Sequence, residues 1–468
     1  MKKLGVCLLI PLIIWLIPAA WIPIDGMTVV EHRMLVIFVL AMLLWVLEPI
    51  PIFATSVLLI GLQLVLISDK GLIWLREAGE GENFGILLSY KTLLGTFSSP
   101  IIMLFLGGFF LAMAATKYRL DANLARVFLK PFGENPKMVM LGLMLITAIF
   151  SMFMSNTATT ALMLAILTPV LKLFRKDDPG RMAFVLSIPF AANIGGMGTP
   201  IGTPPNAVAM KYLTGDNAVS FAEWMLFGVP FAFVMLGIVW WLLLRFNPPQ
   251  EKSIQLTIKG TFDQSVRAWL VYVTFASTII LWLTTALHGM NFYVVAIIPV
   301  VVFVVTGIIT KSDLKRISWD VLWLISGGIA LGLGMESTGL SSHMVASVPF
   351  DSFIPVLIIV LLLLVVLVMS TFISHTATAN LILPIVAALG SNLASLDSYG
   401  GGKMLVICVA LSCSFAMALP VSTPPNAMAY ATGQLDNKTM LKAGSSVSII
   451  GLVMLYLLIP ILNLAGFV

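Results

Sequence analysis

The sequence predicts an all-α polytopic membrane protein, a single transmembrane domain over residues 1–468. Three observations predict this fold class. Of all residues, 59% are hydrophobic and only 10% are charged, with a mean hydropathy of +1.05, whereas soluble domains carry about 25% charged residues. Apolar stretches long enough to cross a bilayer recur from end to end, and three blocks of the first half recur in the second. Since so few charges cannot cover a water-facing surface, a soluble enzyme is excluded.

Apolar windows between charged residues predict eleven transmembrane helices. They lie near residues 4–24, 34–48, 51–68, 98–115, 182–198, 222–245, 268–287, 291–310, 321–339, 404–420 and 442–466. The first window, which follows Lys2 and Lys3, could also be read as a cleaved signal peptide. Its apolar length and the many later spans favour an uncleaved first helix.

Two further apolar segments, 138–171 and 352–389, each carry a polar cluster at their middle. The second lies within residues 317–402, which contain neither Lys nor Arg. The first has basic residues on both sides: Lys130, Lys137, Lys172, Arg175, Lys176 and Arg181. Because both ends of each segment share one charge environment, we predict two re-entrant hairpins with their polar tips at membrane depth. Irregular backbone at that depth is tolerated only inside protein or beside a water-filled cavity.

The distribution of basic residues predicts the orientation. With a cytoplasmic amino terminus, this topology places 20 of the 26 Lys and Arg on the cytoplasmic side and 6 outside. Basic residues accumulate in cytoplasmic loops, so we expect a multi-pass protein of the cell (inner) membrane. Asp121, Arg126 and Lys130, between a span and the first hairpin, suit an amphipathic helix on the inner leaflet.

The chain contains an internal repeat. Shifting it by about 220 residues aligns three pairs of blocks: 104–111 (LFLGGFFL) with 324–331 (LISGGIAL), 151–159 (SMFMSNTAT) with 370–378 (STFISHTAT), and 202–209 (GTPPNAVA) with 422–429 (STPPNAMA). The repeats span 32–246 and 264–466, after an extra first helix in 1–31. Five spans in each repeat, an odd number, place the second copy upside down. Inverted repeats are typical of secondary transporters, although topology alone leaves channels and membrane enzymes open.

Two spans contain a proline pair, at Thr203-Pro204-Pro205 and Thr423-Pro424-Pro425. A proline pair removes two amide donors and disfavours helix at the preceding residue, so each span is expected to break here. Helix ends exposed by a break offer N–H groups and a positive dipole to an anion, and freed carbonyls to a cation. The alternative is a proline kink that serves packing only.

The predicted hairpin tips are Ser155-Asn156-Thr157 and Ser374-His375-Thr376, which supply hydroxyls, one amide and one imidazole. Neither tip contains Lys or Arg. An anion held there needs positive charge from outside the chain, and co-bound cations could supply it, because opposite unit charges about 4 Å apart attract by roughly 4 kcal/mol at an effective dielectric of 20. Ser151 and Ser370 lie one helical turn earlier, where a hydroxyl joins a cation site or bonds back to its own helix.

At these residues the chain resembles the divalent anion:sodium symporter family, the sodium-coupled dicarboxylate, citrate and sulfate carriers. The resemblance covers essentially the whole chain, and its specific part is the duplicated tip together with the duplicated Thr-Pro-Pro-Asn break. It implies eleven spans with two hairpins, a homodimer, and a transport domain that moves elevator-like against a scaffold.

The resemblance also implies residue roles. One substrate carboxylate would face Ser155, Asn156 and Thr157, and the other Ser374, His375 and Thr376. The site would be closed by Thr203, Pro204, Thr423 and Pro424. One sodium ion would be held by Ser151, Ser155, Asn156 and the backbone around Gly202, and a second by Ser370, His375 and Ser422.

His375 departs from the family pattern, which usually has Asn there. Imidazole lacks the amide oxygen that suits sodium, so the second cation site is the one in question. If His375 instead donates a hydrogen bond to the substrate carboxylate, transport should respond to pH in the histidine range. A hydrolase built on Ser374 and His375 is disfavoured, because no carboxylate lies nearby in sequence to orient the imidazole.

The sequence thus predicts a sodium-coupled importer of a divalent anion, such as the C4-dicarboxylate succinate. The alternatives are a cation-independent dicarboxylate exchanger, a sulfate or citrate carrier, an anion channel and a membrane-embedded enzyme. Sodium is the expected coupling ion, without an organic cofactor. The expected partners are the anion, the lipid bilayer and a second copy of the chain, and not nucleic acid. Cys7, Cys408 and Cys413 suit neither a disulfide framework nor a zinc site and are expected in the core.

Overall fold

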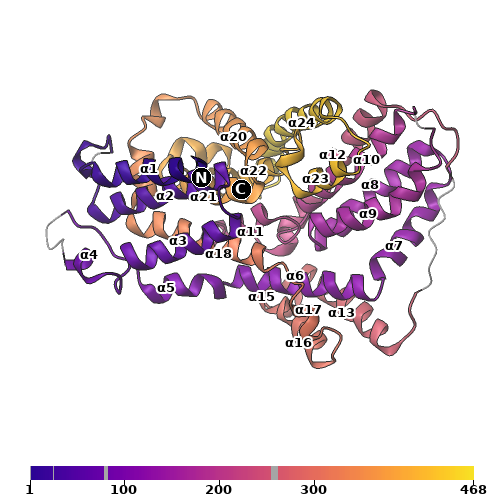
Figure 1. Cartoon of the computed structure of the whole chain (residues 1–468), viewed down its shortest axis with the longest axis horizontal. Coiled ribbons are helices and arrows are strands. Elements are labelled where there is room, and N and C mark those ends of the chain that lie inside the picture. Colours follow the sequence, from indigo (N-terminus) through magenta and orange to yellow (C-terminus); the bar gives the residue numbers. More distant parts are fainter. Residues whose placement is uncertain (1, 25, 78–82, 176, 255–261, 468) are drawn as a thin grey trace.

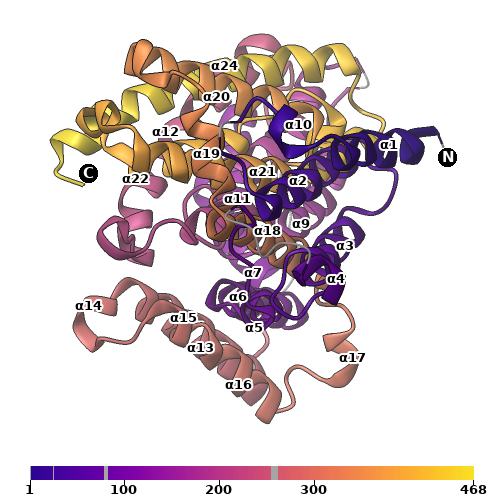
Figure 2. The same ribbon diagram turned by 90° about the vertical axis from the view of Figure 1, so that its left-hand side faces the viewer.

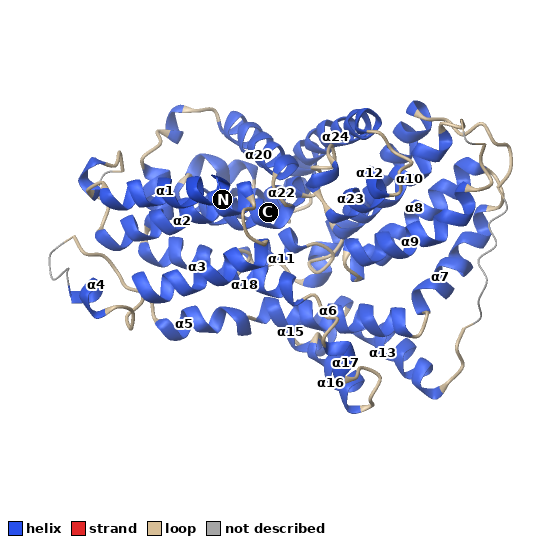
Figure 3. Ribbon diagram, viewed as in Figure 1, coloured by secondary structure: helices blue, strands red, loops and turns tan. Residues whose placement is uncertain are grey.

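A computed structural model describes residues 2–24, 26–77, 83–175, 177–254 and 262–467. Within these ranges the regular structure is helical, apart from an isolated bridge between Ser68 and Leu88 (Figure 3). The predicted all-α fold class is therefore confirmed. Lys176 and Lys259, two of the basic residues assigned to the cytoplasmic side, lie outside the described residues.

The helices fall into two sequential sets. The first set is α1 (Lys2–Leu16), α2 (Val29–Leu47), α3 (Ile52–Leu66), α4 (Ile73–Glu77), α5 (Tyr90–Leu94), α6 (Pro100–Lys117), α7 (Leu120–Leu129), α8 (Pro136–Phe153), α9 (Asn156–Leu171), α10 (Gly180–Gly196), α11 (Pro204–Met210) and α12 (Phe221–Phe246). The second set is α13 (Val266–Leu283), α14 (Thr285–His288), α15 (Phe292–Val295), α16 (Ile297–Val305), α17 (Lys311–Leu314), α18 (Trp319–Thr338), α19 (Leu340–Ala346), α20 (Pro355–Phe372), α21 (His375–Asn392), α22 (Gly401–Cys413), α23 (Pro424–Ala431) and α24 (Asn437–Leu464).

Helix ends differ from the predicted windows where local chemistry intervenes. The first window was predicted to reach residue 24, but α1 ends at Leu16, because Pro18 disfavours helix at the residue before it. α2 begins at Val29, ahead of the predicted 34, because Thr28 and Glu31 form a capping box. Within the described residues, eight helical segments have the length and apolarity needed to cross a bilayer. The count of eleven spans stays a prediction.

The outward surface of the bundle is apolar. Val360, Leu361, Leu364, Val365 and Val368 on α20 each expose more than two fifths of their surface. Exposed faces on α13 and α24 carry large apolar side chains as well. A water-soluble protein rarely exposes such continuous apolar surface, so these faces fit a lipid environment. The three cysteines are buried and free, as predicted for core residues.

Both polar clusters lie at turns between antiparallel helices. α8 ends at Phe153 and α9 begins at Asn156, while α20 ends at Phe372 and α21 begins at His375. Met154 and Ile373 are extended, with φ near −120° (−125° and −119°), which stops each first helix. The two predicted tips therefore occupy the turns of two helical hairpins. Their re-entrant position in a bilayer remains a prediction.

The two halves of the chain interlock through their short helices. α11 packs against α21 and α22, whereas α23 packs against α9 and α10. In Figure 1, α11 and α23 lie between a group containing α1, α2, α3 and α21 and a group containing α7, α8 and α9. Figure 2 shows α13, α15 and α16 along one edge of the molecule. Each short helix thus packs against helices of the other half, an arrangement that we call the exchange of α11 and α23. It brings both hairpin tips and both chain breaks to the centre of the molecule.

Candidate functional site

A cavity of about 350 Å³ lies where the tips and breaks meet, and we call it the central cavity. Twelve of the predicted site residues line it: Ser155, Asn156, Thr157, Gly202, Thr203, Pro204, Ser374, His375, Thr376, Ser422, Thr423 and Pro424. These residues come from four segments separated by up to about 270 positions in the chain. The remaining two predicted residues, Ser151 and Ser370, are fully buried behind the tips and do not form the wall.

The tip serines are helix N-caps. The Ser155 hydroxyl accepts a hydrogen bond from the Ala158 backbone N–H, and the Ser374 hydroxyl accepts one from the Ala377 N–H, both at 3.2 Å. Such caps use oxygen lone pairs, so each hydroxyl proton remains free for a ligand. The caps also place the amino-terminal ends of α9 and α21, with their positive dipole ends, at the cavity.

The chain breaks form as the proline pairs predict. Thr203 and Thr423 are extended, with φ of −145° and −144°, and each is followed by a proline that opens a short helix. The Thr423 hydroxyl accepts from the Asn426 N–H at 3.2 Å and from the Asn193 side chain at 3.3 Å. Four helix N-termini therefore meet at the central cavity, two from hairpins and two from breaks.

Two asparagines hold the chain in its broken form. The Asn206 side-chain amide donates to the carbonyls of Gly196, Met197 and Thr199, at 3.1, 3.4 and 2.8 Å. The Asn426 amide donates to the carbonyls of Met417 and Leu419, both at 3.1 Å. Carbonyls left by the interrupted helix thus gain partners inside the protein. Neither asparagine was predicted to have a role, although both stand in the duplicated Pro-Pro-Asn motif.

The first predicted cation site has converging oxygens. In one orientation of the Asn156 amide, its oxygen lies 2.6 Å from Ser151 Oγ, 2.9 Å from the Gly202 carbonyl oxygen and 3.3 Å from the Ala192 carbonyl oxygen. In the other orientation, its nitrogen takes that place and donates to the same oxygens. The second orientation satisfies the amide within the protein, whereas the first leaves carbonyl oxygens facing one another, an arrangement that would need a small cation to stabilise it. The donor set fits a hard cation such as sodium.

Two glycines permit this close approach. A methyl group on Gly202 would meet the Gly196 carbonyl oxygen, and one on Gly196 would lie 2.7 Å from the Asn156 side chain. A Cβ atom at either position would push apart the backbone around the converging oxygens. The close approach of the backbone at positions 196 and 202 therefore requires glycine at position 202.

The second predicted cation site is less compact. The Ser422 hydroxyl donates to the Thr371 carbonyl at 2.7 Å, and Ser370 lies beside the Cys413 thiol. His375 Nε2 lies 3.0 Å from the Ala416 carbonyl oxygen. Because a carbonyl only accepts, Nε2 carries the ring proton, and Nδ1 of the neutral ring is an acceptor. The neutral ring could therefore ligate a cation through Nδ1, and Nδ1 donates to a carboxylate only when the ring is protonated.

The structure adds wall residues that our sequence analysis missed. Asn193 and Asp320 are polar, and each stands alone in or beside an apolar window. A lone polar residue in such a window was the available signal. The other additions are apolar: Ile52, Phe53, Phe105, Phe109, Ile201, Val321, Leu324 and Pro425. Pro425 belongs to the second proline pair, while the others resemble the many apolar residues around them.

The charge of the central cavity is unfavourable for an unaccompanied anion. None of the described residues that line it is Lys or Arg, and Asp320 adds a carboxylate. Helix N-termini and hydroxyls stabilise an anion without neutralising it. The cavity can therefore hold a dianion together with cations far better than the dianion alone.

Residues 42–399 of the chain match the citrate transporter family. A sodium-dependent dicarboxylate transporter, SdcS, of Staphylococcus saprophyticus is 29% identical over 466 residues, covering 90% of this chain and 85% of that protein. An uncharacterized transporter of Haemophilus influenzae is 31% identical over 389 residues, covering 79% of this chain and 82% of that protein. An uncharacterized transporter of Schizosaccharomyces pombe is 31% identical over 453 residues, and the chain, matched over 93% of its length, spans only 50% of that protein.

Two solved structures have a similar fold. The YdaH transporter of Alcanivorax borkumensis aligns with a TM-score of 0.56 at 14% identity, over 93% of this chain and 99% of that chain. MtrF of Neisseria gonorrhoeae aligns with a TM-score of 0.50 at 12% identity, over 88% of this chain and 95% of that chain. Identities this low concern the fold alone.

Proposed function

We propose that this chain, which belongs to the citrate transporter family, is a sodium-coupled symporter that imports a divalent anion, with succinate as the representative substrate. Family membership bears out the resemblance to divalent anion:sodium symporters that the motifs indicated. The relatives are named as transporters rather than enzymes. The name of SdcS, a sodium-dependent dicarboxylate transporter, supports both the ion and the substrate class.

The observation that carries the proposal is the composition of the central cavity. Two hydroxyl-rich tips and two proline breaks face one space, with Asp320 as the charged group of its described wall. In this proposal Ser155, Asn156 and Thr157 bind one carboxylate of the substrate, and Ser374, His375 and Thr376 bind the other. Sodium ions compensate the charge that the wall does not.

Transport then requires that the central cavity open to each side in turn. We infer that the two hairpins and two breaks move together, elevator-like, against a scaffold that forms a homodimer in the inner membrane. The topology of eleven spans, two re-entrant hairpins, inverted repeats and a cytoplasmic amino terminus belongs to this proposal. The excess of basic residues on the proposed inner side supports the orientation.

The experiment is uptake of radiolabelled succinate into proteoliposomes that contain the purified full-length chain. An inward sodium gradient should drive accumulation above the external concentration, and an equal gradient of choline should not. A cation-independent exchanger would instead need succinate preloaded inside and would ignore the sodium gradient. Adding unlabelled citrate or sulfate as competitors at varied sodium ranks the possible substrates in the same assay.

A further inference from the structure

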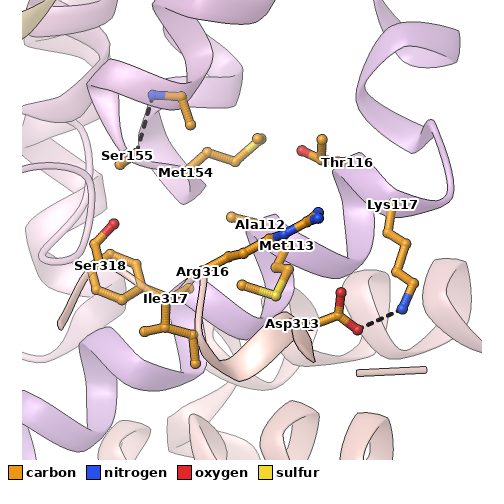
Figure 4. A pocket seen from close by; sticks show the side chains of 12 residues that line it. Ala112, Met113, Thr116, Lys117, Met154, Ser155, Asp313, Arg316, Ile317 and Ser318 are labelled. Atoms are coloured by element: carbon orange, nitrogen blue, oxygen red, sulfur yellow. Dashed lines mark hydrogen bonds and ion pairs between the residues drawn. The ribbon is translucent and has the colours of Figure 1, made fainter. Parts of the chain in front are cut away.

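A second cavity of about 360 Å³ adjoins the central cavity, and we call it the vestibule. Its wall consists of the carboxyl-terminal half of α6, the tip of the first hairpin, Asp313 and residues 316–318 (Figure 4). Phe109 and Ser155 line both cavities. The segment before α18 also serves both, since Ser318 lines the vestibule and Asp320 the central cavity. A solute in the vestibule is therefore next to the proposed substrate site.

The vestibule carries an uncompensated positive charge. Lys117 Nζ lies 2.6 Å from Asp313 Oδ2 and donates to the Ile308 carbonyl at 2.8 Å, so its charge is paired. In the part of the chain that the structure describes, the Arg316 guanidinium has neither an ion pair nor a hydrogen bond to a protein group. Figure 4 shows Arg316 extending across the vestibule, whereas Lys117 turns toward Asp313.

The charges of the two cavities differ in sign. Arg316 leaves the vestibule with one net positive charge, while Asp320 gives the central cavity a negative one. A dicarboxylate is therefore attracted to the vestibule without any cation, but needs cations to occupy the central cavity. An arginine fork also matches the two oxygens of one carboxylate.

Ser155 connects the two cavities chemically. Its oxygen accepts from the Ala158 N–H, so its hydroxyl proton is free to donate toward either side. Thr116, also in the vestibule wall, already donates to Asp121 at 2.9 Å and has no proton left. A carboxylate that moves from the central cavity to Arg316 can thus keep the Ser155 hydroxyl as a hydrogen-bond donor on the way.

We propose that the vestibule is a second anion site, in which Arg316 binds a carboxylate of the dicarboxylate in the absence of sodium. The identity of this ligand as a dicarboxylate rests on the proposed function. In the proposed orientation, Arg316 lies on the cytoplasmic side, so the vestibule holds the anion on its way out of the central cavity into the cell.

The test is equilibrium binding of radiolabelled succinate to the purified full-length chain in sodium-free choline buffer. The wild type should bind, with an affinity that falls as choline chloride is raised, because exposed charges are screened by salt. Arg316→Gln should weaken this binding about tenfold or more, as expected for a lost charged hydrogen bond. Lys315→Gln removes an equal charge from an exposed neighbour outside the vestibule wall and should leave the affinity unchanged. Arg316→Lys keeps the charge but lacks the fork, so its affinity should lie between those of the wild type and Arg316→Gln.

Comparison with sodium buffer separates this proposal from the proposed function. Asn156→Ala should lose the additional binding that sodium induces and keep the sodium-free binding, while Arg316→Gln should do the reverse. If Asn156→Ala keeps sodium-dependent binding, the proposed function of the tip fails and the vestibule site stands. The vestibule proposal is overturned if the wild type binds no succinate without sodium, or if Arg316→Gln binds as well as Lys315→Gln.

Discussion

The Ser155 and Ser374 hydroxyls each have one bond inside the chain and one proton to spare. Each caps a hairpin helix through its oxygen, which fixes the side chain at the cavity wall. Thr157 and Thr376, two residues later, line the same wall. At the residue scale, the cavity thus offers positioned donors that stabilise carboxylates without a fixed positive charge.

Thr157→Ala tests the first tip. Loss of its hydroxyl should abolish sodium-driven succinate uptake without preventing folding, because the Thr157 side chain makes no hydrogen bond among the described residues. Thr168→Ala is a matched control on the same helix, since Thr168 bonds back to the Leu164 carbonyl at 2.8 Å away from the cavity. Initial uptake rates and melting temperatures of both variants should be measured. Near-normal uptake by Thr157→Ala would refute the proposed tip.

His375→Asn tests the departure from the family pattern. The amide oxygen is a better ligand for sodium than the imidazole, so half-maximal uptake should need less sodium, with transport retained. An unchanged sodium requirement in His375→Asn would show that the imidazole does not stand in the place of a sodium ligand.

The ion pair between Lys117 and Asp313 gives a stability prediction. Hydrogen bonds from Lys117 and from the Thr310 N–H lower the pKa of Asp313 from 3.8 to about 2. A lowered pKa means that the ionised carboxylate stabilises the fold at any pH above its usual value, and that this stabilisation is lost as the pH falls toward about 2. Asp313→Asn should therefore lower the melting temperature at neutral pH, and the difference from the wild type should shrink below about pH 4. A difference that stays constant down to pH 3 would contradict this assignment.

At the scale of elements, each chain break combines prolines, which interrupt the helix, with an asparagine, which stabilises the interrupted backbone. The proline pairs begin the second helix of each break, α11 and α23, and the side chains of Asn206 and Asn426 bind the carbonyls that the break leaves free. Burying those carbonyls without partners would cost about 1–3 kcal/mol each. The asparagine of the Pro-Pro-Asn motif thus makes an irregular backbone possible inside the bundle.

Gly202→Ala tests the geometry of the first break. The added methyl group meets the Gly196 carbonyl oxygen, so the backbone must shift away from Asn156. We expect uptake to fall at least about tenfold, with a marked rise in the sodium concentration needed, since a shift of about 1 Å can cost that much. Gly237→Ala on α12 is the matched control, because a methyl there has no neighbour within 4 Å. Equal uptake by the two variants would exclude a role for this close approach.

The sequence predicted the positions of these elements better than their ends. Both tips were predicted from polar residues in apolar surroundings and both breaks from proline pairs, and the turns at Ser155 and Ser374 lie inside the predicted clusters. The predicted end of α1 was wrong because the window was set by apolar residues, which continue past Pro18, whereas the helix ends before this proline. The exchange of α11 and α23 between the two halves has no sequence signal, because it depends on which surfaces pack together.

At the scale of the whole molecule, that exchange creates the site. Each break packs against hairpin helices of the other half, so tips from distant parts of the chain face one cavity. Phe105 could not be assigned from the sequence because it is one apolar residue among many, whereas the charge of Asp320 beside an apolar window was an available signal. The polar residues of the site could be predicted from the sequence because polar residues are rare in this chain. The apolar residues of the site could not be distinguished from the many other apolar residues.

The central claim is that anion and sodium occupy the cavity together and cross the membrane as one load. Coupling is reciprocal, so a gradient of either solute must move the other. The most direct measurement is uptake of radiolabelled sodium into proteoliposomes driven by an inward succinate gradient, with no initial sodium gradient. We predict sodium accumulation in the wild type and none in Asn156→Ala. Succinate entry without any accompanying sodium would contradict the account.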